Sequence, residues 1–147
     1  LQITEDHTEK QNKKMLDEII RIVDSNEDLD FYIRNHPRFN NFIDISELEK
    51  KTNLAPESLM ECFVLCSIHI TSYSTTTFEC SEFGIPTIFL KSLKEEFNMF
   101  ETDFTYPFNV EMIDIIKDYS KYSDAVISWR KEYYSDYDED KFISLLK

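Results

Sequence analysis

The sequence has very little glycine: one residue, Gly84, in a chain of 147 residues. The G-x-G-x-x-G loop of dinucleotide-binding domains and the Walker A loop both need several glycines, because the backbone must approach the phosphates closely. The chain therefore cannot be a dehydrogenase or an ATPase that uses either loop. If it binds a nucleotide, other groups must hold the phosphates.

Positive charge is also scarce, since 16 Lys and Arg stand against 29 Asp and Glu and give a formal net charge of −13. A protein that wraps nucleic acid needs a basic face, so no nucleic-acid partner is expected. A small anionic ligand remains compatible with this charge, because a pair of arginines and a helix N-terminus suffice to bind one phosphate.

Long hydrophobic runs and paired cysteines are missing too. No run approaches the roughly 18 apolar residues of a membrane-spanning helix, so no transmembrane segment is expected. Cys62 and Cys66 lie four residues apart in an apolar stretch, and Cys80 is the third cysteine. Free, buried thiols and a reducing, cytoplasmic location are therefore favoured over a zinc site. The chain starts at Leu1 rather than at Met, which predicts a fragment of a larger protein.

Short β-rich runs alternate with helical periods along the chain. This alternation predicts an α/β fold: one Rossmann-like, three-layer domain over residues 1–147, with a parallel sheet, helices on both faces and a helical C-terminal region. The expected strands are Leu1–Thr4, Leu29–Arg34, Ile68–Ser72 and Pro86–Leu90, with a brief one near Phe42–Ile45. The expected helices run from a capping box at Thr8 to Val23, over Ser46–Lys51, Glu57–Cys66 and Thr75–Phe83, beyond Met112, and over Asp138–Leu146, and Gly84 ends the fourth of them.

Ligands of parallel α/β sheets bind outside the carboxyl ends of the strands, and the first polar cluster at such a position is Arg34-Asn35-His36-Pro37-Arg38. A histidine on a loop stiffened by proline can donate a hydrogen bond to a phosphate oxygen. Arg34 and Arg38 add charge in a geometry that suits phosphate. The alternative is that His36 stabilises a turn and the arginines pair with carboxylates.

The second cluster follows the strand Ile68–Ser72 and runs into a helix through a row of hydroxyls, Ser72, Ser74, Thr75, Thr76 and Thr77. Helix N-terminal N–H groups and hydroxyl donors together suit a phosphate without any glycine loop. Glu79, one turn into the helix, can accept hydrogen bonds from the two hydroxyls of a ribose. The alternative is an ordinary N-cap, with Glu79 favourable to the helix dipole.

A receiver domain is a further alternative, because Glu5-Asp6 is an acidic pair after a predicted strand. A receiver also needs a phosphoacceptor aspartate at the end of its third strand. The chain offers only Asp44 there, and no clear strand leads into it.

His36-Pro37 followed by Ser74-Thr75 resembles the C-terminal, nucleotide-sugar-binding domain of bacterial glycosyltransferases with two Rossmann-like domains (GT-B-like), such as capsule and sialyltransferase-like enzymes. The string ITSYSTTTFECSEFGIPTIF also resembles the teichoic-acid glycerophosphotransferases, although Ser72 stands where they have Asp before Tyr-Ser. It is similar, more loosely, to nucleotide-sugar 2-epimerases.

The resemblance implies that His36 is catalytic and, with Ser74 and Thr75, holds the donor phosphate, while Glu79 holds the ribose. It implies a CMP-, UDP- or CDP-activated sugar, no metal and no cofactor. The acceptor domain and the general base would lie N-terminal to this chain, so the chain alone would bind a donor without turnover. The expected setting is surface-polysaccharide synthesis in the cytoplasm, including the inner face of the membrane. The remaining alternative is a non-catalytic domain that binds a partner through its acidic Tyr133–Asp140 region.

Overall fold

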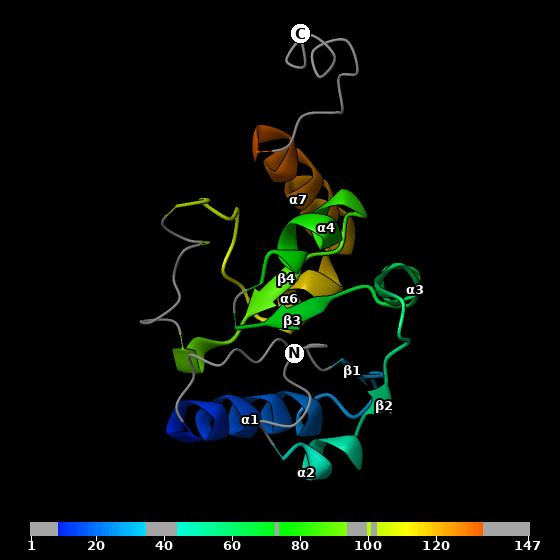
Figure 1. Ribbon diagram of the computed structural model, residues 1–147. Helices are drawn as coiled ribbons and strands as arrows, with labels where there is room; N and C mark the ends of the chain where they lie inside the picture. The colour runs from blue at the N-terminus through cyan, green and yellow to red at the C-terminus, as the bar shows by residue number, and fades with distance from the viewer. Residues whose placement is uncertain (1–8, 35–43, 73, 94–99, 101–102, 134–147) are drawn as a thin grey trace, which may run out of the picture.

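The computed structural model describes residues 9–34, 44–72, 74–93, 100 and 103–133 (Figure 1). Helices and short strands alternate along this part of the chain. In order they are α1 (Glu9–Asp24), β1 (Tyr32–Ile33), α2 (Ser46–Glu49), β2 (Asn53–Leu54), α3 (Leu59–Leu65), β3 (His69–Thr71), α4 (Thr76–Glu82), β4 (Thr87–Phe89), the 3-10 helix η1 (Lys91–Leu93), α6 (Met112–Lys117) and α7 (Tyr119–Tyr133).

The described strands form two parallel pairs, β1 with β2 and β3 with β4. The predicted α/β class and parallel pairing are therefore confirmed at this level. That Leu29–Arg34, Ile68–Ser72 and Pro86–Leu90 belong to one continuous sheet stays a prediction, because the described strands form two sheets of two strands each. The three-layer Rossmann-like arrangement remains a prediction.

The strands are shorter than the sequence predicts, and one of them was missed. Within the predicted strand Leu29–Arg34 only Tyr32–Ile33 pairs with a neighbour. No strand was expected at Asn53–Leu54, whose two residues are both exposed and carry no alternating pattern. The segment Phe42–Ile45 lies partly outside the described residues, and Asp44 and Ile45 are not in a strand.

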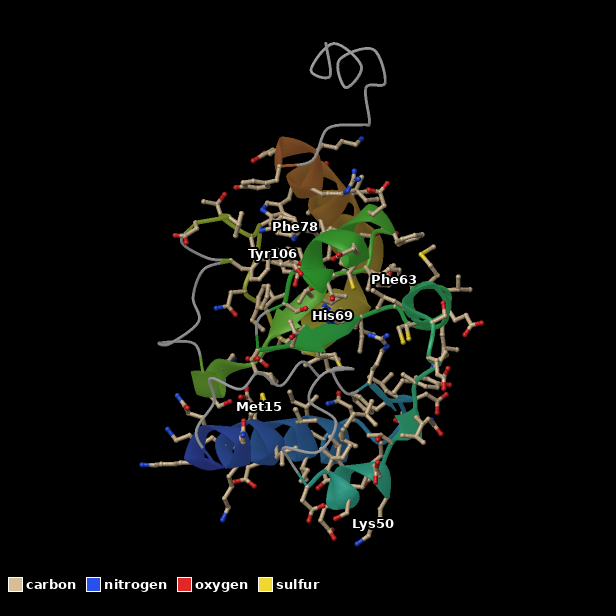
Figure 2. All side chains as sticks on the ribbon, in the orientation of Figure 1. Met15, Lys50, Phe63, His69, Phe78 and Tyr106 are labelled. Atoms are coloured by element: carbon tan, nitrogen blue, oxygen red, sulfur yellow. The ribbon has the colours of Figure 1, made fainter. Side chains whose placement is uncertain are left out.

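Helix α1 packs beneath both strand pairs through one apolar face (Figure 1). Met15, Ile19 and Val23 recur every four residues, and all three are buried, as the helical period predicts. They share a cluster with Ile33 of β1 and Ile70 of β3. Figure 2 labels Met15 on α1.

A second core, made mostly of aromatic rings, joins α4 to α7 on the other side of β3 and β4. Phe78 of α4 stacks on Trp129 of α7, with ring centroids 5.0 Å apart and planes 7° apart. The Tyr106 hydroxyl accepts a hydrogen bond of 2.7 Å from the main-chain N–H of Thr87, the first residue of β4. This core therefore fixes the start of β4 as well as the position of α4 (Figure 2).

Three predicted helices, α2, α3 and α4, are confirmed within two residues at each end. The helical region expected beyond Met112 is confirmed as α6 and α7, and α1 ends one residue after the expected Val23. Gly84 follows α4 with φ +67°, which is the left-handed conformation of a helix-ending glycine. The predicted strand Leu1–Thr4, the helix Asp138–Leu146 and most of the region Tyr133–Asp140 lie outside the described residues. No helix in the described part of the chain is long and apolar enough to cross a membrane.

Candidate functional site

The turn between β3 and α4 holds most of the predicted phosphate-binding hydroxyls. Ser72 is 3% and Ser74 is 4% exposed, whereas Thr76 is half-buried and Thr75 is exposed. The turn follows the carboxyl end of β3, as the sequence predicts. Two of its hydroxyls thus lie beneath the surface, and two are within reach of a ligand in solvent.

Ser74 stabilises the start of α4. Its Oγ accepts a hydrogen bond of 3.2 Å from the N–H of Thr76, and its carbonyl accepts one of 3.0 Å from Thr77. The N-cap residue of α4 is Thr75, whose side chain makes no capping hydrogen bond, and Ser74 lies one residue before it. The Ser74 hydroxyl can still bind a ligand, because a serine that accepts one hydrogen bond has its own O–H to donate.

Three hydroxyls around this turn are buried and have no hydrogen-bond partner among the described residues: Thr71 Oγ1, Ser72 Oγ and Thr77 Oγ1. Nearly all buried polar groups in proteins are paired. A buried hydroxyl left unpaired costs about 1–3 kcal/mol. Thr71 and Ser72 are neighbours in the sequence, and Thr77 lies in the first turn of α4.

The other predicted ligand residues lie farther from this cluster or outside the described chain. The Arg34 guanidinium is half-buried after β1 and donates a hydrogen bond of 3.1 Å to the carbonyl of Glu57, ahead of α3. His36 and Arg38 lie outside the described residues, so their predicted proximity to Ser74 is untested. The charge of Arg34 is thus partly used to hold two loops together.

Glu79 is exposed on α4 and lines a hollow of about 210 Å³ between α3, α4 and α7. Met60, Phe63 and Phe83 form its apolar wall, and Glu82 there pairs with Arg130. None of the described residues Arg34, Ser72 or Ser74 lines this hollow. Glu79 lies in α4, and Ser72 and Ser74 lie in the turn before it, but Glu79 and these two serines do not line the same cavity.

A larger cavity, of about 390 Å³, lies between the two strand pairs and was not predicted. Its walls include Phe31–Ile33 beside β1 and Ser67, Ile68 and Ile70 beside β3, with α1 beneath. None of the described residues between Thr71 and Glu79 lines it. Sequence reasoning could not find this cavity, because its walls come from segments that are more than thirty residues apart.

Two other titratable side chains, His69 and Asp44, make contacts within the fold. The His69 ring is held by a contact of 3.1 Å between its Nδ1 and Thr87 Oγ1, across the β3–β4 pair. Burial lowers the pKa of His69 to about 3, so this ring is neutral at pH 7. Asp44, the candidate of the receiver alternative, accepts a hydrogen bond from Ser46 N–H at the start of α2.

The three cysteines are free thiols, as predicted. Cys80 is buried, and burial raises its pKa to about 12, which makes it a poor nucleophile at neutral pH. Cys62 in α3 and Cys66 just after it are half-buried rather than fully buried. Within the described ranges, no three His, Cys, Asp or Glu side chains are grouped so that they could hold a metal ion.

Comparisons with known proteins identify no relative of this chain: no family model, no curated protein and no solved structure matches it.

Proposed function

We propose that this chain binds the nucleotide-activated sugar of a glycosyltransferase that builds bacterial surface polysaccharide. The observation that carries the proposal is the Ser72 hydroxyl, which is buried after β3 and has no partner among the described residues. Parallel strands of an α/β protein present their ligand sites at their carboxyl ends, where Ser72 lies. A phosphate oxygen that reaches this turn would satisfy the hydroxyl.

The hydroxyl turn supplies donors for such a phosphate. Ser72 and Ser74 each have an O–H to donate, and Thr75 and Thr76 follow at the start of α4. In the proposed reaction the sugar moves to its acceptor and the electron pair of the breaking bond goes to the phosphate oxygen. Hydrogen bonds to the phosphate stabilise that negative charge, and His36 and the arginines Arg34 and Arg38 are the further candidates for this task.

The scheme needs no metal ion and no cofactor. The general base that deprotonates the acceptor is proposed to come from a separate acceptor-binding domain. The donor is a CMP-, UDP- or CDP-sugar, and a glycerophosphotransferase or a 2-epimerase with the same phosphate site would bind the same class of nucleotide. All three share the step tested below, which is binding of a nucleotide phosphate at the end of β3.

We expect Ser72→Ala to lower the affinity for CDP or UDP by about fivefold or more, because a hydroxyl-to-phosphate hydrogen bond contributes about 1–3 kcal/mol. The free energy of unfolding should stay equal or rise, since the substitution removes a buried hydroxyl that has no partner in the described part of the chain. Isothermal titration calorimetry and urea unfolding measure the two effects separately.

Thr71→Val is the matched control for this experiment. Thr71, one residue earlier in the chain, also has a buried hydroxyl with no partner among the residues that the structure describes, and valine keeps its shape. Neighbouring strand residues point to opposite faces, so Thr71→Val should leave nucleotide affinity unchanged. If Ser72→Ala binds as well as the wild type, or if both variants lose affinity alike, the phosphate is not held by Ser72.

The role of Glu79 is tested by Glu79→Gln. If its carboxylate accepts hydrogen bonds from the ribose hydroxyls, the substitution should weaken nucleotide binding by about ten- to a hundredfold. The free energy of unfolding should change by less than about 1 kcal/mol, because an exposed first-turn carboxylate contributes little through the helix dipole. Titration of both proteins with CMP, UDP and CDP also identifies the preferred base.

Glu61→Gln is the control for Glu79→Gln, since Glu61 is likewise exposed in the first turn of its helix, α3. It should change neither affinity nor stability. Loss of stability with intact affinity in Glu79→Gln would make Glu79 a structural residue.

One observation favours a second candidate, a non-catalytic interaction domain. Met60, Val64 and Phe83 are 56%, 86% and 48% exposed, and α3 carries the first two. Apolar side chains gathered at the surface often mark a protein contact. Thermal unfolding separates the candidates: a nucleotide at 100 times its dissociation constant adds about 2.7 kcal/mol to a nucleotide-binding domain. It adds nothing to a pure interaction domain.

A further inference from the structure

One side of helix α3 is apolar and lies at the surface. The helix packs on α4 through its opposite side, where Phe63 shares a buried cluster with Cys80. Met60 and Val64 are four residues apart, on one side of the helix, and are 56% and 86% exposed. Figure 1 shows α3 at the edge of the molecule, beyond the strands and α4. Exposed apolar side chains gathered in this way favour a contact surface.

This side of α3 borders the hollow of about 210 Å³ between α3, α4 and α7. Met60 and the exposed Phe83 line the hollow, together with the buried rings of Phe63 and Phe78, which Figure 2 labels. Pockets that enclose a small molecule have volumes of about 300–1,000 Å³. The hollow is smaller than this, so it suits a single side chain of a protein partner.

The charged groups of this surface are mainly acidic. Glu79 and Glu82 line the hollow together with Arg130, and Glu82 forms an ion pair with Arg130. Two carboxylates and one guanidinium give the hollow a net charge of −1, in a chain whose formal net charge is −13. Complementary charge guides a partner to its surface, and like charge excludes wrong partners. The charge of this surface therefore fits a basic partner.

We infer that Met60, Val64, Phe83 and Glu79 form a docking surface for a basic, amphipathic segment of another protein. An apolar side chain of that segment enters the hollow between Met60 and Phe83, and a lysine or arginine beside it pairs with Glu79. Amphipathic segments commonly bind in this way, with their apolar face in a groove. The inference rests on the second candidate function, an interaction domain, and names the class of its partner.

Charge also decides against two other occupants of the surface. A second copy of this chain carries the same net charge of −13. Residues 134–147 of the same chain contain four acidic residues and two lysines, so they are acidic as well. Either occupant places like charges near Glu79 and Glu82, which weakens the contact. A segment rich in lysine or arginine meets no such repulsion.

Nuclear magnetic resonance of the intact chain with two helical peptides tests the inference. Both peptides have leucine on one face, and the polar face consists of lysine in the first and glutamate in the second. We expect the Leu–Lys peptide to shift the methyl signals of Met60 and Val64 and the ring signals of Phe83. The Leu–Glu peptide should shift none of these signals, because its carboxylates face Glu79.

Glu79→Lys should lower the affinity for the Leu–Lys peptide by about fivefold or more and allow the Leu–Glu peptide to bind, because it replaces an attraction by a repulsion. Glu49→Lys is the matched control. Glu49 is exposed on α2, which lies at the other end of the molecule from α4 (Figure 1), and its replacement changes the net charge equally. It should leave both affinities unchanged at physiological salt, where distant charges are screened.

Val64→Ser should lower the affinity for the Leu–Lys peptide by about threefold or more, because apolar area that the peptide covers is lost. Ile113→Ser is its control, since Ile113 is 50% exposed on α6 and does not line the hollow. It should leave peptide binding unchanged. Neither Val64→Ser nor Ile113→Ser should alter the affinity for CDP or UDP, and Ser72→Ala should not alter peptide binding. Nucleotide binding and docking can therefore fail separately.

Four results would overturn the inference. The first is an equal affinity of the wild type for the two peptides, or no shift at Met60 and Val64. The second is an equal loss of affinity in Glu79→Lys and Glu49→Lys, which would show attraction by net charge alone. The third is a nuclear Overhauser contact from Met60 or Val64 to residues 134–147, which would make the chain's own segment the occupant. The fourth is a shift of these signals with protein concentration alone, which would indicate a second copy.

Discussion

Replacing Phe78 with alanine is expected to lower the free energy of unfolding by about 3–5 kcal/mol. The Phe78 ring is 6% exposed, stacks on Trp129 at 5.0 Å and meets the edge of Phe104 at 5.1 Å. Removing it leaves a cavity where α4, α7 and the aromatic residues around Phe100 meet. Equilibrium unfolding in urea, followed by Trp129 fluorescence, measures the change in the midpoint at constant slope.

Phe83→Ala is the control for this substitution, because Phe83 lies directly after the same helix but is 48% exposed. It keeps one stacking contact, with Phe63 at 5.1 Å. Its replacement should therefore cost clearly less, about 1 kcal/mol. Equal effects of the two substitutions would show that α4 is not held by the aromatic core.

The helices could be predicted from the sequence because their signals are local. The four-residue recurrence of Met15, Ile19 and Val23 is enough to identify α1 and its buried face. Gly84 could be assigned as a helix end because a glycine after a helical period usually adopts the left-handed conformation. Both signals lie within a few residues of the structure that they specify.

The strand pairs could be predicted only in part. β3 and β4 lie within the runs Ile68–Ser72 and Pro86–Leu90, whose β-branched residues favour strands. β2 could not be predicted, because its residues Asn53 and Leu54 pair with β1 through main-chain groups alone. How the two pairs join depends on contacts between distant segments, which no local pattern contains.

The candidate site, too, could be predicted only in part. The row of hydroxyls from Ser72 to Thr77 is visible in the sequence, and its place after β3 follows from the strand. Which hydroxyls are exposed does not follow, because burial depends on how α4 packs against β3 and α7. The Ser74 Oγ accepts a hydrogen bond at the start of α4, while the Ser72 Oγ is buried with no partner among the described residues, although both residues are serines of one turn. Only the packing of α4 shows which serine stabilises the helix start and which is a candidate to bind a ligand.

Gly84→Ala is expected to lower the free energy of unfolding by about 2–4 kcal/mol, because two costs add at this position. The first is conformational: φ is +67°, and a residue with a Cβ atom adopts this region at a cost of about 1–2 kcal/mol. The second is steric: a Cβ atom on Gly84 would collide with Ser123 Oγ and lie 3.1 Å from Ile127 Cδ1, both on α7. Thermal or urea unfolding measures the sum.

A double-mutant cycle with Ser123→Ala separates the two costs, because it removes the Oγ atom that the new Cβ meets and leaves the backbone of Gly84 unchanged. The Gly84→Ala effect should shrink by about 1 kcal/mol or more in the Ser123→Ala background, while the conformational cost remains. No coupling between the two sites would mean that α7 does not approach the end of α4. The approach matters beyond this contact, since the Tyr119 hydroxyl also donates to Gly84 O, and α7 thereby holds the end of the helix whose start carries the proposed phosphate site.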